Sequence, residues 1–223
     1  MSKKPILYYN ILSPPCRAVL MCGADIGIDF ELKNIDLIGF EHKSPSFIEK
    51  NPQHTVPLLD DDGILISDSH AICAYLVEKF ADSDHLYPKD LVKRAIVDSR
   101  LHFDSGHLFC RLRMLYEPIL YMGSGEMSED RIKYIQSQWD ILNRFVANTL
   151  FVCGDKVTIA DFCLAATTHS LIDTAPLNSD EHLKILDWLD RMAELPYYED
   201  LNAIPSRDLQ ASVRAMQQNN SKK

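Results

Sequence analysis

The sequence lacks the features that mark several large classes of protein. No stretch approaches the roughly 18 consecutive apolar residues of a membrane-spanning helix, and the apolar run after Lys4 is too short for a signal peptide. The net charge of −9 lacks the excess of Lys and Arg that a nucleic-acid-binding face requires. We therefore expect a soluble, cytoplasmic protein that binds neither nucleic acid nor a membrane.

Paired cysteines are absent as well. The six cysteines form no Cys-x-x-Cys pair and no His/Cys cluster at metal-ligand spacing, so we expect free, mostly buried thiols in a reducing compartment and no metal. Ser13-Pro14-Pro15-Cys16 has the spacing of a redox pair whose first sulfur is replaced. A dithiol cycle needs two sulfurs, which disfavours disulfide reduction. A mixed disulfide on Cys16 stays the alternative, and we expect Cys16 to pack against a sheet.

What is present is a globular composition, with 46% apolar and 25% charged residues in a chain of 223. That length suffices for one large or two small domains. The first third of the chain favours alternating strands and helices. Residues 6–9 read as a strand, Pro14-Pro15 opens a helix that reaches about residue 25 or 26 before Gly27, and residues 30–35 read as a second, parallel strand.

A hairpin and a helix complete this first part. Residues 57–59 and 65–67 flank Asp60-Asp61-Asp62-Gly63, whose Asp-Gly step is typical of a tight hairpin turn. Residues 69–80 then have the period of a helix. The order β-α-β-loop-β-β-α predicts a thioredoxin-like α/β domain over residues 1–80.

The rest of the chain favours helices alone. A polar, proline-bearing linker over residues 81–90 leads to an all-α domain over residues 91–223. We expect helices at about 91–122, 128–148, 158–173 and 181–193 and a short piece near 197–202, with a polar tail, 206–223, of uncertain order. Pro118 should kink the first helix near its end or stop it early.

Thr158-Ile159-Ala160-Asp161 has the pattern of a capping box at a helix start. The Thr158 hydroxyl can accept from the backbone N–H of Asp161, and the Asp161 carboxylate can accept from that of Thr158, with Val157 and Phe162 as a hydrophobic staple. Its role is structural, and loss of either partner should cost about 0.5–2 kcal/mol.

Two segments indicate a ligand cradle. Pro57 cannot donate to a sheet ladder, so it should begin its strand and leave the backbone of Val56 free to bond a guest peptide. A cis Val56–Pro57 bond would present both polar groups of Val56, although only about 5–6% of such bonds are cis. Asp68-Ser69-His70 begins a helix whose free N–H groups favour an anion. Together these segments predict a small, acidic, peptide-like ligand.

Motifs from both halves carry a family resemblance. Ser-Pro-Pro at the first helix, NPQHTVP, DSHAI, LYPKD before the helical half and TIADF inside it occur in the order of the cytosolic glutathione transferases. The chain resembles the insect epsilon class most and the delta class second, over almost its whole length. The resemblance implies the glutathione transferase fold, glutathione as co-substrate, and a homodimer whose interface follows the last helix of the first domain and the long helices.

The resemblance also assigns roles to residues. Ser13 would be the catalytic hydroxyl that stabilises the glutathione thiolate, whereas the sequence alone favours a helix cap at this position. Asp68 stands where many members have Glu and has a shorter reach. The resemblance assigns glutathione binding to the residues of the cradle and to one residue of the helical half, namely His42, His54, Thr55, Val56, Pro57, Asp68, Ser69, His70 and Arg113. For Arg113 the alternative is an ion pair with Glu117, four residues further along the same helix.

The second substrate needs an apolar wall near the sulfur. On their own, the side chains at helical spacing around residues 109–121 favour a bundle core, but the resembling family places this helix above the thiol. The expected hydrophobic pocket comprises Leu12, Pro14, Phe109, Leu112, Tyr116, Leu120 and Tyr121.

We therefore predict a glutathione transferase that conjugates glutathione to, or eliminates halide from, hydrophobic electrophilic compounds in detoxification, including insecticides. One alternative is a specialised member that acts on an endogenous steroid-like or lipid substrate. Another is a non-catalytic carrier of lipophiles.

Overall fold

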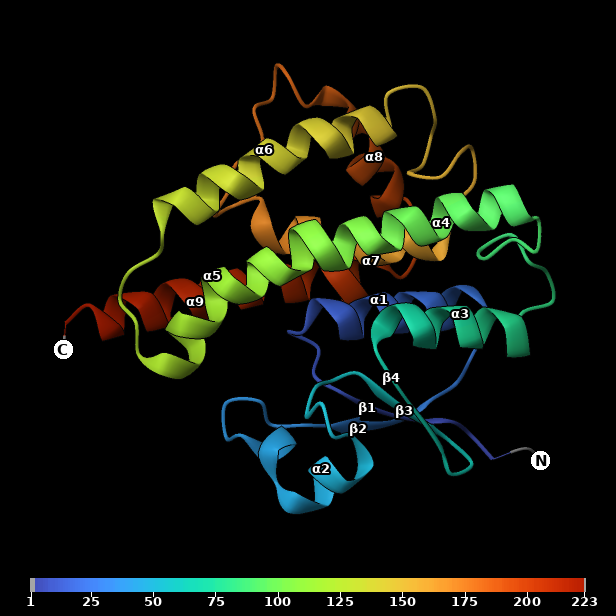
Figure 1. The fold of residues 1–223 in the computed structure, drawn as a ribbon, viewed down its shortest axis with the longest axis horizontal. Coiled ribbons are helices and arrows are strands. Elements are labelled where there is room, and N and C mark those ends of the chain that lie inside the picture. The colour runs from blue at the N-terminus through green and yellow to red at the C-terminus, as the bar shows by residue number, and fades with distance from the viewer. Residues whose placement is uncertain (1–2, 223) are drawn as a thin grey trace.

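A computed structural model describes residues 3–222 and places a four-stranded sheet in the first third of the chain (Figure 1). Strand order is β2-β1-β3-β4, with β1 parallel to β2 and antiparallel to β3. This is the predicted thioredoxin-like arrangement, with α1 and α3 between the sheet and the later helices and α2 on the other side. The elements are β1 (Ile6–Tyr9), α1 (Pro14–Asp25), β2 (Glu31–Asn34), η1 (Glu41–Lys43), α2 (Pro45–Lys50), β3 (Leu58–Asp61), β4 (Ile64–Ser67) and α3 (Ser69–Phe80).

The β3–β4 hairpin confirms the Asp-Gly turn. Asp62 and Gly63 both have left-handed backbones, with φ of 53° and 90°, as a tight hairpin turn requires. The backbone N–H of Gly63 donates to the Asp60 carboxylate at 2.8 Å and closes the turn. This turn fixes the register in which Leu58 pairs with Ser67, so that Ser67 leads directly into Asp68 and α3.

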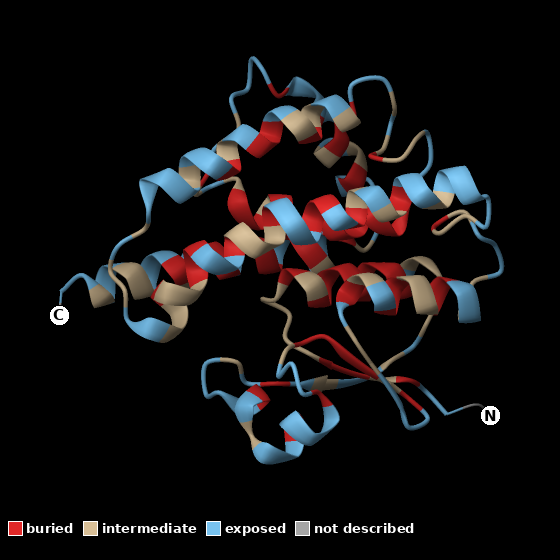
Figure 2. Ribbon diagram, viewed as in Figure 1, coloured by how far each residue is buried: buried red, intermediate tan, exposed pale blue. Residues whose placement is uncertain are grey.

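The remaining elements are helical. They are α4 (Leu91–Phe103), the π-helical η2 (Asp104–Phe109), α5 (Cys110–Met122), α6 (Glu129–Phe145), α7 (Ile159–Leu171), α8 (Leu183–Ala193), the π-helical η3 (Glu199–Ala203) and α9 (Ile204–Asn220). All but one residue of α7 are buried, because the helix runs through the middle of the molecule and packs on α1 and α4 (Figure 2). The predicted fold, an α/β amino-terminal part and a helical carboxy-terminal part, is confirmed.

The prediction of one helix over residues 91–122 is wrong in its middle. Residues 104–109 form a π-helical segment that separates α4 from α5. Pro118 does not stop the helix, because α5 continues to Met122 and ends at Gly123, whose φ of 71° is typical of a helix C-cap.

The expectation of uncertain order after residue 206 is also wrong. Residues 204–220 form α9, which buries Leu209 and Val213 against α5 and α7. Asn220 fixes the far end of α9, because its side-chain amide donates to the carbonyl oxygens of Ile119 and Ser124 at 3.0 and 3.1 Å. Residue 223 of the predicted tail lies outside the described residues.

The capping box at the start of α7 is present. The fully buried Asp161 carboxylate accepts from the backbone N–H and the hydroxyl of Thr158 at 2.8 and 3.0 Å. It also accepts from the Val152 N–H and the Trp188 indole, so it joins α7 to α8 as well as capping α7. Burial raises the pKa of Asp161 to about 6 even though these four donors oppose the shift.

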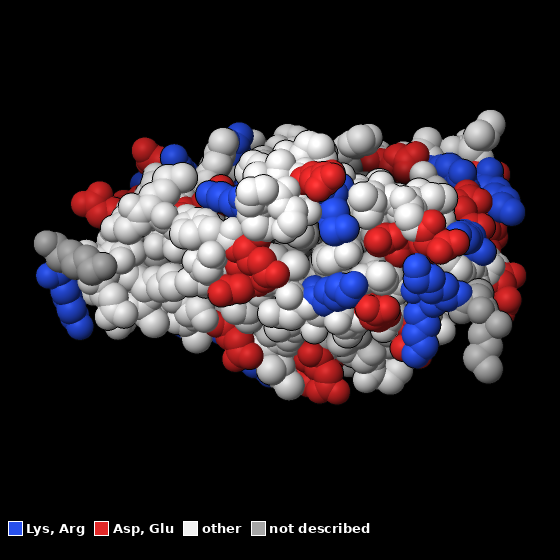
Figure 3. All heavy atoms as spheres, turned by 90° about the horizontal axis from the view of Figure 1, so that it is seen from below, with Lys and Arg blue, Asp and Glu red and all other residues white. Residues whose placement is uncertain are grey.

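On the face seen in Figure 3, Lys and Arg side chains alternate with Asp and Glu, and the described residues there form no continuous basic field. None of the helices in residues 3–222 is long and apolar enough to cross a membrane.

Candidate functional site

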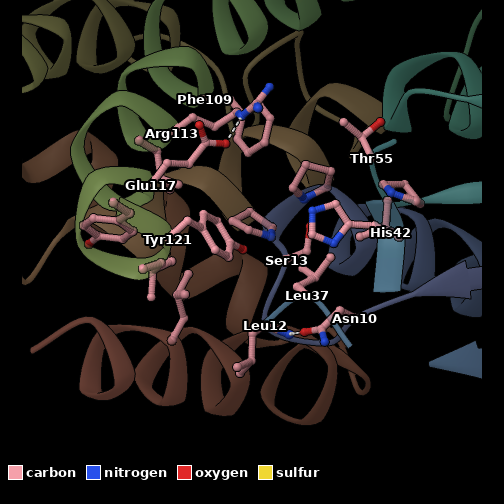
Figure 4. A pocket seen from close by; sticks show the side chains of 18 of the residues that line it. Asn10, Leu12, Ser13, Leu37, His42, Thr55, Phe109, Arg113, Glu117 and Tyr121 are labelled. Carbon is pink, nitrogen blue, oxygen red and sulfur yellow. Dashed lines mark hydrogen bonds and ion pairs between the residues drawn. The ribbon is translucent and has the colours of Figure 1, made fainter. Parts of the chain in front are cut away.

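A cavity of about 490 Å³ lies between the loops of the first part and helices α5 and α9 (Figure 4). The structure brings all the predicted site residues to this one cavity: Leu12, Ser13, Pro14, His42, His54, Thr55, Val56, Pro57, Asp68, Ser69, His70, Phe109, Leu112, Arg113, Tyr116, Leu120 and Tyr121. The sequence therefore predicted the location of the site, whereas the role of each residue stays a prediction.

Ser13 stands at the N-cap of α1, and its hydroxyl makes no capping hydrogen bond. The loop before it is held by Asn10, whose side chain accepts from the Leu12 N–H and donates to the Ile35 carbonyl, both at 3.0 Å. The Asn10 carbonyl accepts from the Ser13 N–H, also at 3.0 Å. The hydroxyl of Ser13 is thus placed at the cavity by its neighbours and left free to donate.

Cys16 is fully buried and packs against the sheet as predicted, in a cluster with Tyr8, Val56 and Leu58. Burial raises the pKa of the Cys16 thiol to about 11, although the Asn10 N–H, which donates to the sulfur at 3.5 Å, and the nearby Ser13 side chain oppose the shift. Because the thiolate is the reactive form, a mixed disulfide on Cys16 is disfavoured.

The backbone of Val56 is available for a guest. The Val56–Pro57 peptide bond is cis, and among the described residues no hydrogen bond occupies the N–H or the carbonyl of Val56. The preceding loop is fixed by the buried side chain of Asn51, which donates to the Thr55 carbonyl at 2.8 Å and accepts from the Gln53 N–H at 3.1 Å. An extended peptide can therefore pair with Val56 without displacing a bond of the protein.

Asp68 caps α3 from a left-handed backbone, with φ of 77°. One carboxylate oxygen accepts from the N–H groups of His70 and Ala71 at 2.9 and 3.3 Å. Two of the helix-start donors that the sequence offered to an anion are therefore already bound, which corrects that part of the prediction. Among the described residues no hydrogen bond occupies the second Asp68 oxygen, and both Asp68 and the buried Ser69 line the cavity.

Two histidines lie side by side on the same wall. The rings of His42 and His54 are 6.4 Å apart, and that of Tyr121 lies 6.5 Å from His42. Burial, together with the nearby Lys43 and His54, lowers the pKa of His42. The Nδ1 atom of His42 is buried and has no hydrogen-bond partner in the described residues, so the side chain has a polar atom to offer a ligand.

The opposite wall comes from helices. Phe109 closes η2, while Leu112, Tyr116 and Leu120 follow on one face of α5. Tyr116 contributes only ring surface, because its hydroxyl donates to the Ser170 carbonyl at 2.8 Å in the core. Burial raises the pKa of Tyr116 to about 12, so its hydroxyl stays neutral.

Comparisons with known proteins decide the family. Residues 7–84 match the family model described as glutathione S-transferase, N-terminal domain. The chain is 41% identical to glutathione S-transferase 1 of Manduca sexta over 205 residues, covering 91% of this chain and 94% of the relative. The chain belongs to the glutathione S-transferase family.

Solved structures of glutathione S-transferases agree over the whole fold. The epsilon-class enzyme of the housefly, Musca domestica, superimposes with a TM-score of 0.93 at 40% identity and covers 96% of this chain and 98% of its own. A glutathione transferase homologue from Drosophila mojavensis, solved with bound glutathione, superimposes with a TM-score of 0.93 at 41% identity. The match covers 97% of this chain and 98% of the homologue. The predicted likeness to insect epsilon-class glutathione transferases is confirmed.

Within this glutathione S-transferase fold, Arg113 forms an ion pair with Glu117 at 2.6 Å, the alternative that the sequence offered. Figure 4 shows both side chains at the edge of the cavity. His70 lies against Asp104, with Nε2 3.1 Å from the carboxylate, and so joins α3 to η2. Although burial opposes it, the hydrogen bond and charge of Asp104 raise the pKa of His70.

Sequence reasoning missed several residues of this transferase site. Asn10 and Asn51 shape the two loops but are single loop residues with no periodic signal. Further lining residues come from α9 and from the loop after β2, namely Leu37, Ile38, Leu209, Ser212 and Met216. The spacing of Leu209, Val213 and Met216 is helical and was the signal that could have revealed α9.

No group of three or more His, Cys, Asp or Glu residues that could hold a metal ion occurs in the described part of this glutathione S-transferase chain.

Proposed function

We propose that this glutathione transferase catalyses attack of the glutathione thiolate on an electrophilic carbon of a hydrophobic compound, or uses that thiolate to eliminate halide. A free thiol, with a pKa of about 8.5, is only a few per cent thiolate at neutral pH. The observation that carries the proposal is the Ser13 hydroxyl, which has no bond to its own helix and lies at the cavity. There it can donate to the sulfur, and the positive end of α1 adds to the stabilisation.

The polar wall supports a pose for glutathione. The cysteinyl part pairs with the free backbone of Val56 beside Pro57. The γ-glutamyl end binds at Asp68 and Ser69, where one carboxylate oxygen remains for its ammonium group. The glycyl carboxylate faces residues His42 and His54, and further contacts come from Thr55, His70 and Arg113.

The helical wall supports a lipophilic acceptor. Its lining is largely aliphatic and aromatic, and such a surface favours planar or halogenated compounds through burial of apolar area. Leu12, Pro14, Phe109, Leu112, Tyr116, Leu120 and Tyr121 form this proposed pocket. Detoxification of xenobiotics, insecticides among them, is the role that fits such a pocket.

Retention on immobilised glutathione, combined with conjugation of a generic aryl halide, tests this function. The expected protein binds the resin, elutes with free glutathione and forms the thioether. Retention without turnover would indicate a carrier, and failure of folded protein to bind glutathione would contradict the proposal. Competition by endogenous steroid-like or lipid compounds in the same assay would reveal a specialised substrate.

We further propose a homodimer. Strand β4 is an edge of the sheet, and large apolar side chains are exposed on it and along α4: Ile64, Leu65, Leu91, Val92 and Ile96. Sedimentation should give twice the mass of the chain, and Val92→Lys should shift the protein toward the monomer. A monomer at every concentration of the wild type would contradict this proposal.

The six cysteines are free thiols, which supports a reducing, cytoplasmic compartment. Cell fractionation tests that localisation, and recovery of the protein from an oxidising compartment would contradict it.

A further inference from the structure

The guanidinium of Arg17, on α1, lies directly behind the loop that carries Ser13. Its side chain is completely buried, with 0% exposed. Nη1 donates to the carbonyl oxygens of Leu12 at 2.8 Å and Ile11 at 3.4 Å. The residue before Ser13 is therefore held by a buried cation.

The other side of the same guanidinium contacts the helical part of the chain. Nε donates to the side-chain oxygen of Asn202, in η3, at 3.0 Å. Nη2 donates to the Ala166 carbonyl at 3.1 Å and to the Ser170 hydroxyl, both in α7. Arg17 thus connects the Ser13 loop to α7 and η3. Both of these helices contact α9, which lines the acceptor pocket.

No carboxylate in residues 3–222 forms an ion pair with Arg17. The titratable groups that face it are Cys16 on α1, His169 on α7 and Tyr198 just before η3. Burial holds all three neutral, since it raises the pKa of Cys16 to about 11, lowers that of His169 to about 4 and raises that of Tyr198. None of them compensates the charge of Arg17 at neutral pH.

Two acidic groups that act on His169, a neighbour of Arg17, are occupied at the surface. Glu199 and Asp173, which act on His169 from a distance, pair with Arg207 at 2.6 Å and Arg214 at 3.1 Å. These ion pairs are exposed and screened by solvent. The positive charge of Arg17 therefore reaches its buried surroundings largely uncancelled.

An unpaired buried charge is costly, and a cation in a low-dielectric interior acts strongly on neighbouring anions. Burial lowers the pKa of Arg17 to about 9, so the side chain stays protonated at neutral pH. Its hydrogen bonds to carbonyl, amide and hydroxyl oxygens satisfy the donors without cancelling the charge.

We propose that Arg17 is a positioning residue for the reaction at Ser13: it holds the Leu12–Ser13 loop, and its uncompensated charge favours the thiolate form of bound glutathione. This inference rests on the proposed function, because it assumes that the thiol of glutathione ionises beside Ser13. It assigns to a buried residue outside the cavity lining a share of the thiolate stabilisation.

Asn202→Asp tests the charge with little change of shape. The Asn202 Nδ2 atom is buried and has no hydrogen-bond partner in the described residues, so replacing it by a carboxylate oxygen breaks no bond. The new carboxylate would neutralise Arg17. We expect the pKa of the bound glutathione thiol, followed by its ultraviolet absorbance, to rise by about one unit. The kcat/KM value should fall about tenfold below that pKa and approach the wild-type value at high pH.

Arg17→Lys and Arg17→Gln form a matched pair that removes most of the same hydrogen bonds and differs in charge. Both should lower the melting temperature. The thiol pKa should stay near the wild-type value in the Lys variant and rise by about one unit in the Gln variant. Equal thiol pKa values in the two variants, or an unshifted thiol pKa in Asn202→Asp, would overturn the inference.

Ser13→Ala separates this inference from the proposed function. If Ser13→Ala raises the thiol pKa and Asn202→Asp does not, the role of Arg17 is wrong and the proposed chemistry stands. If Ser13→Ala leaves the thiol pKa and turnover unchanged, the proposed function of Ser13 fails whatever the Arg17 variants do.

Discussion

The two walls of the cavity are built by different means. The amino-terminal wall consists of loops and helix starts, and two of its residues, His54 and Asp68, have left-handed backbones with φ of 45° and 77°. Such conformations are rare for residues other than glycine and persist only where the surroundings impose them. The helical wall consists of regular side-chain faces on α5 and α9. One wall is therefore specified by backbone geometry and the other by side-chain identity.

This difference explains how one protein can hold a constant co-substrate and still vary its acceptor. Substitution of a side chain does not remove backbone groups such as those of Val56. The peptide-binding wall therefore keeps these hydrogen-bonding groups when its sequence changes. A side chain on a helix face, such as Leu112 or Met216, can change without altering the helix. The predictions below test whether the two walls are separable in this way.

The largest effect is expected from Ser13→Ala on the polar wall. Loss of a hydroxyl donor to a developing or resident anion should lower kcat/KM about 100-fold with any acceptor. Retention on immobilised glutathione should persist, because the backbone of Val56 is untouched. Ser105→Ala, at another cavity-lining serine, is the control and should leave turnover nearly unchanged. Full activity in Ser13→Ala would refute the catalytic assignment.

Asp68 should show a double effect, because it caps α3 and faces the ligand. Asp68→Ala should raise the KM for glutathione about tenfold through loss of a charged hydrogen bond, and should cost about 1 kcal/mol of stability through loss of the cap. Asp68→Asn keeps a capping oxygen and removes the charge, so only the KM should change. If Asp68→Asn binds glutathione as the wild type does, the ammonium group is not held by this carboxylate.

Met216→Ala tests the helical wall, with a smaller effect confined to one substrate. Loss of apolar contact worth about 1 kcal/mol should raise the KM of a lipophilic acceptor about fivefold. The KM for glutathione should not change. Gln218→Ala, at an exposed position of the same helix, should leave both values unaltered. Equal losses for both substrates would show that the walls are not separable.

The smallest expected effect is on stability and concerns His70 of α3, which contacts Asp104 of η2 where the amino-terminal part meets the helical part. Asp104 raises the pKa of His70 above its ordinary value of about 6.5, although burial opposes the shift. The stabilisation from this pair should be complete below about pH 6.5 and disappear as the pH rises through the raised pKa.

Chemical unfolding of His70→Gln and wild type across this pH range measures that contribution. The variant should be less stable by about 1 kcal/mol at acidic pH, and the difference should shrink in alkaline solution. A difference that does not vary with pH would show that folding does not raise the pKa of His70.

The sequence predicted features that local chemistry decides. Pro14-Pro15 opens α1, Asp62-Gly63 makes the hairpin turn, and Thr158 with Asp161 caps α7, because each depends on backbone preferences a few residues apart. The family motifs then indicated which loops form the cavity.

The features that escaped prediction depend on distant contacts. The polar α9 is a helix because Leu209 and Val213 pack against α5 and α7. At its far end the Asn220 side chain donates to the carbonyl oxygen of Ile119. A periodic pattern also cannot distinguish a continuous helix from one interrupted by a π-helical segment, which is why η2 was missed. The burial of Arg17 could not be predicted from the sequence either, because its hydrogen-bond partners in the helical part of the chain lie at least 149 residues away.

The π-helical segment η2 lets the chain change in length without turning α5. Each residue of an α-helix advances the direction of the side chains by about 100°. A π-helical turn holds about one residue more than an α-helical turn, because its hydrogen bonds span five residues instead of four. A single-residue deletion between Asp104 and Phe109 that restored α-helical spacing would therefore keep the stripe of Leu112, Tyr116 and Leu120 on the same side of the molecule. The acceptor wall formed by α5 tolerates at this segment a change of length that would turn its face if it fell within a regular helix.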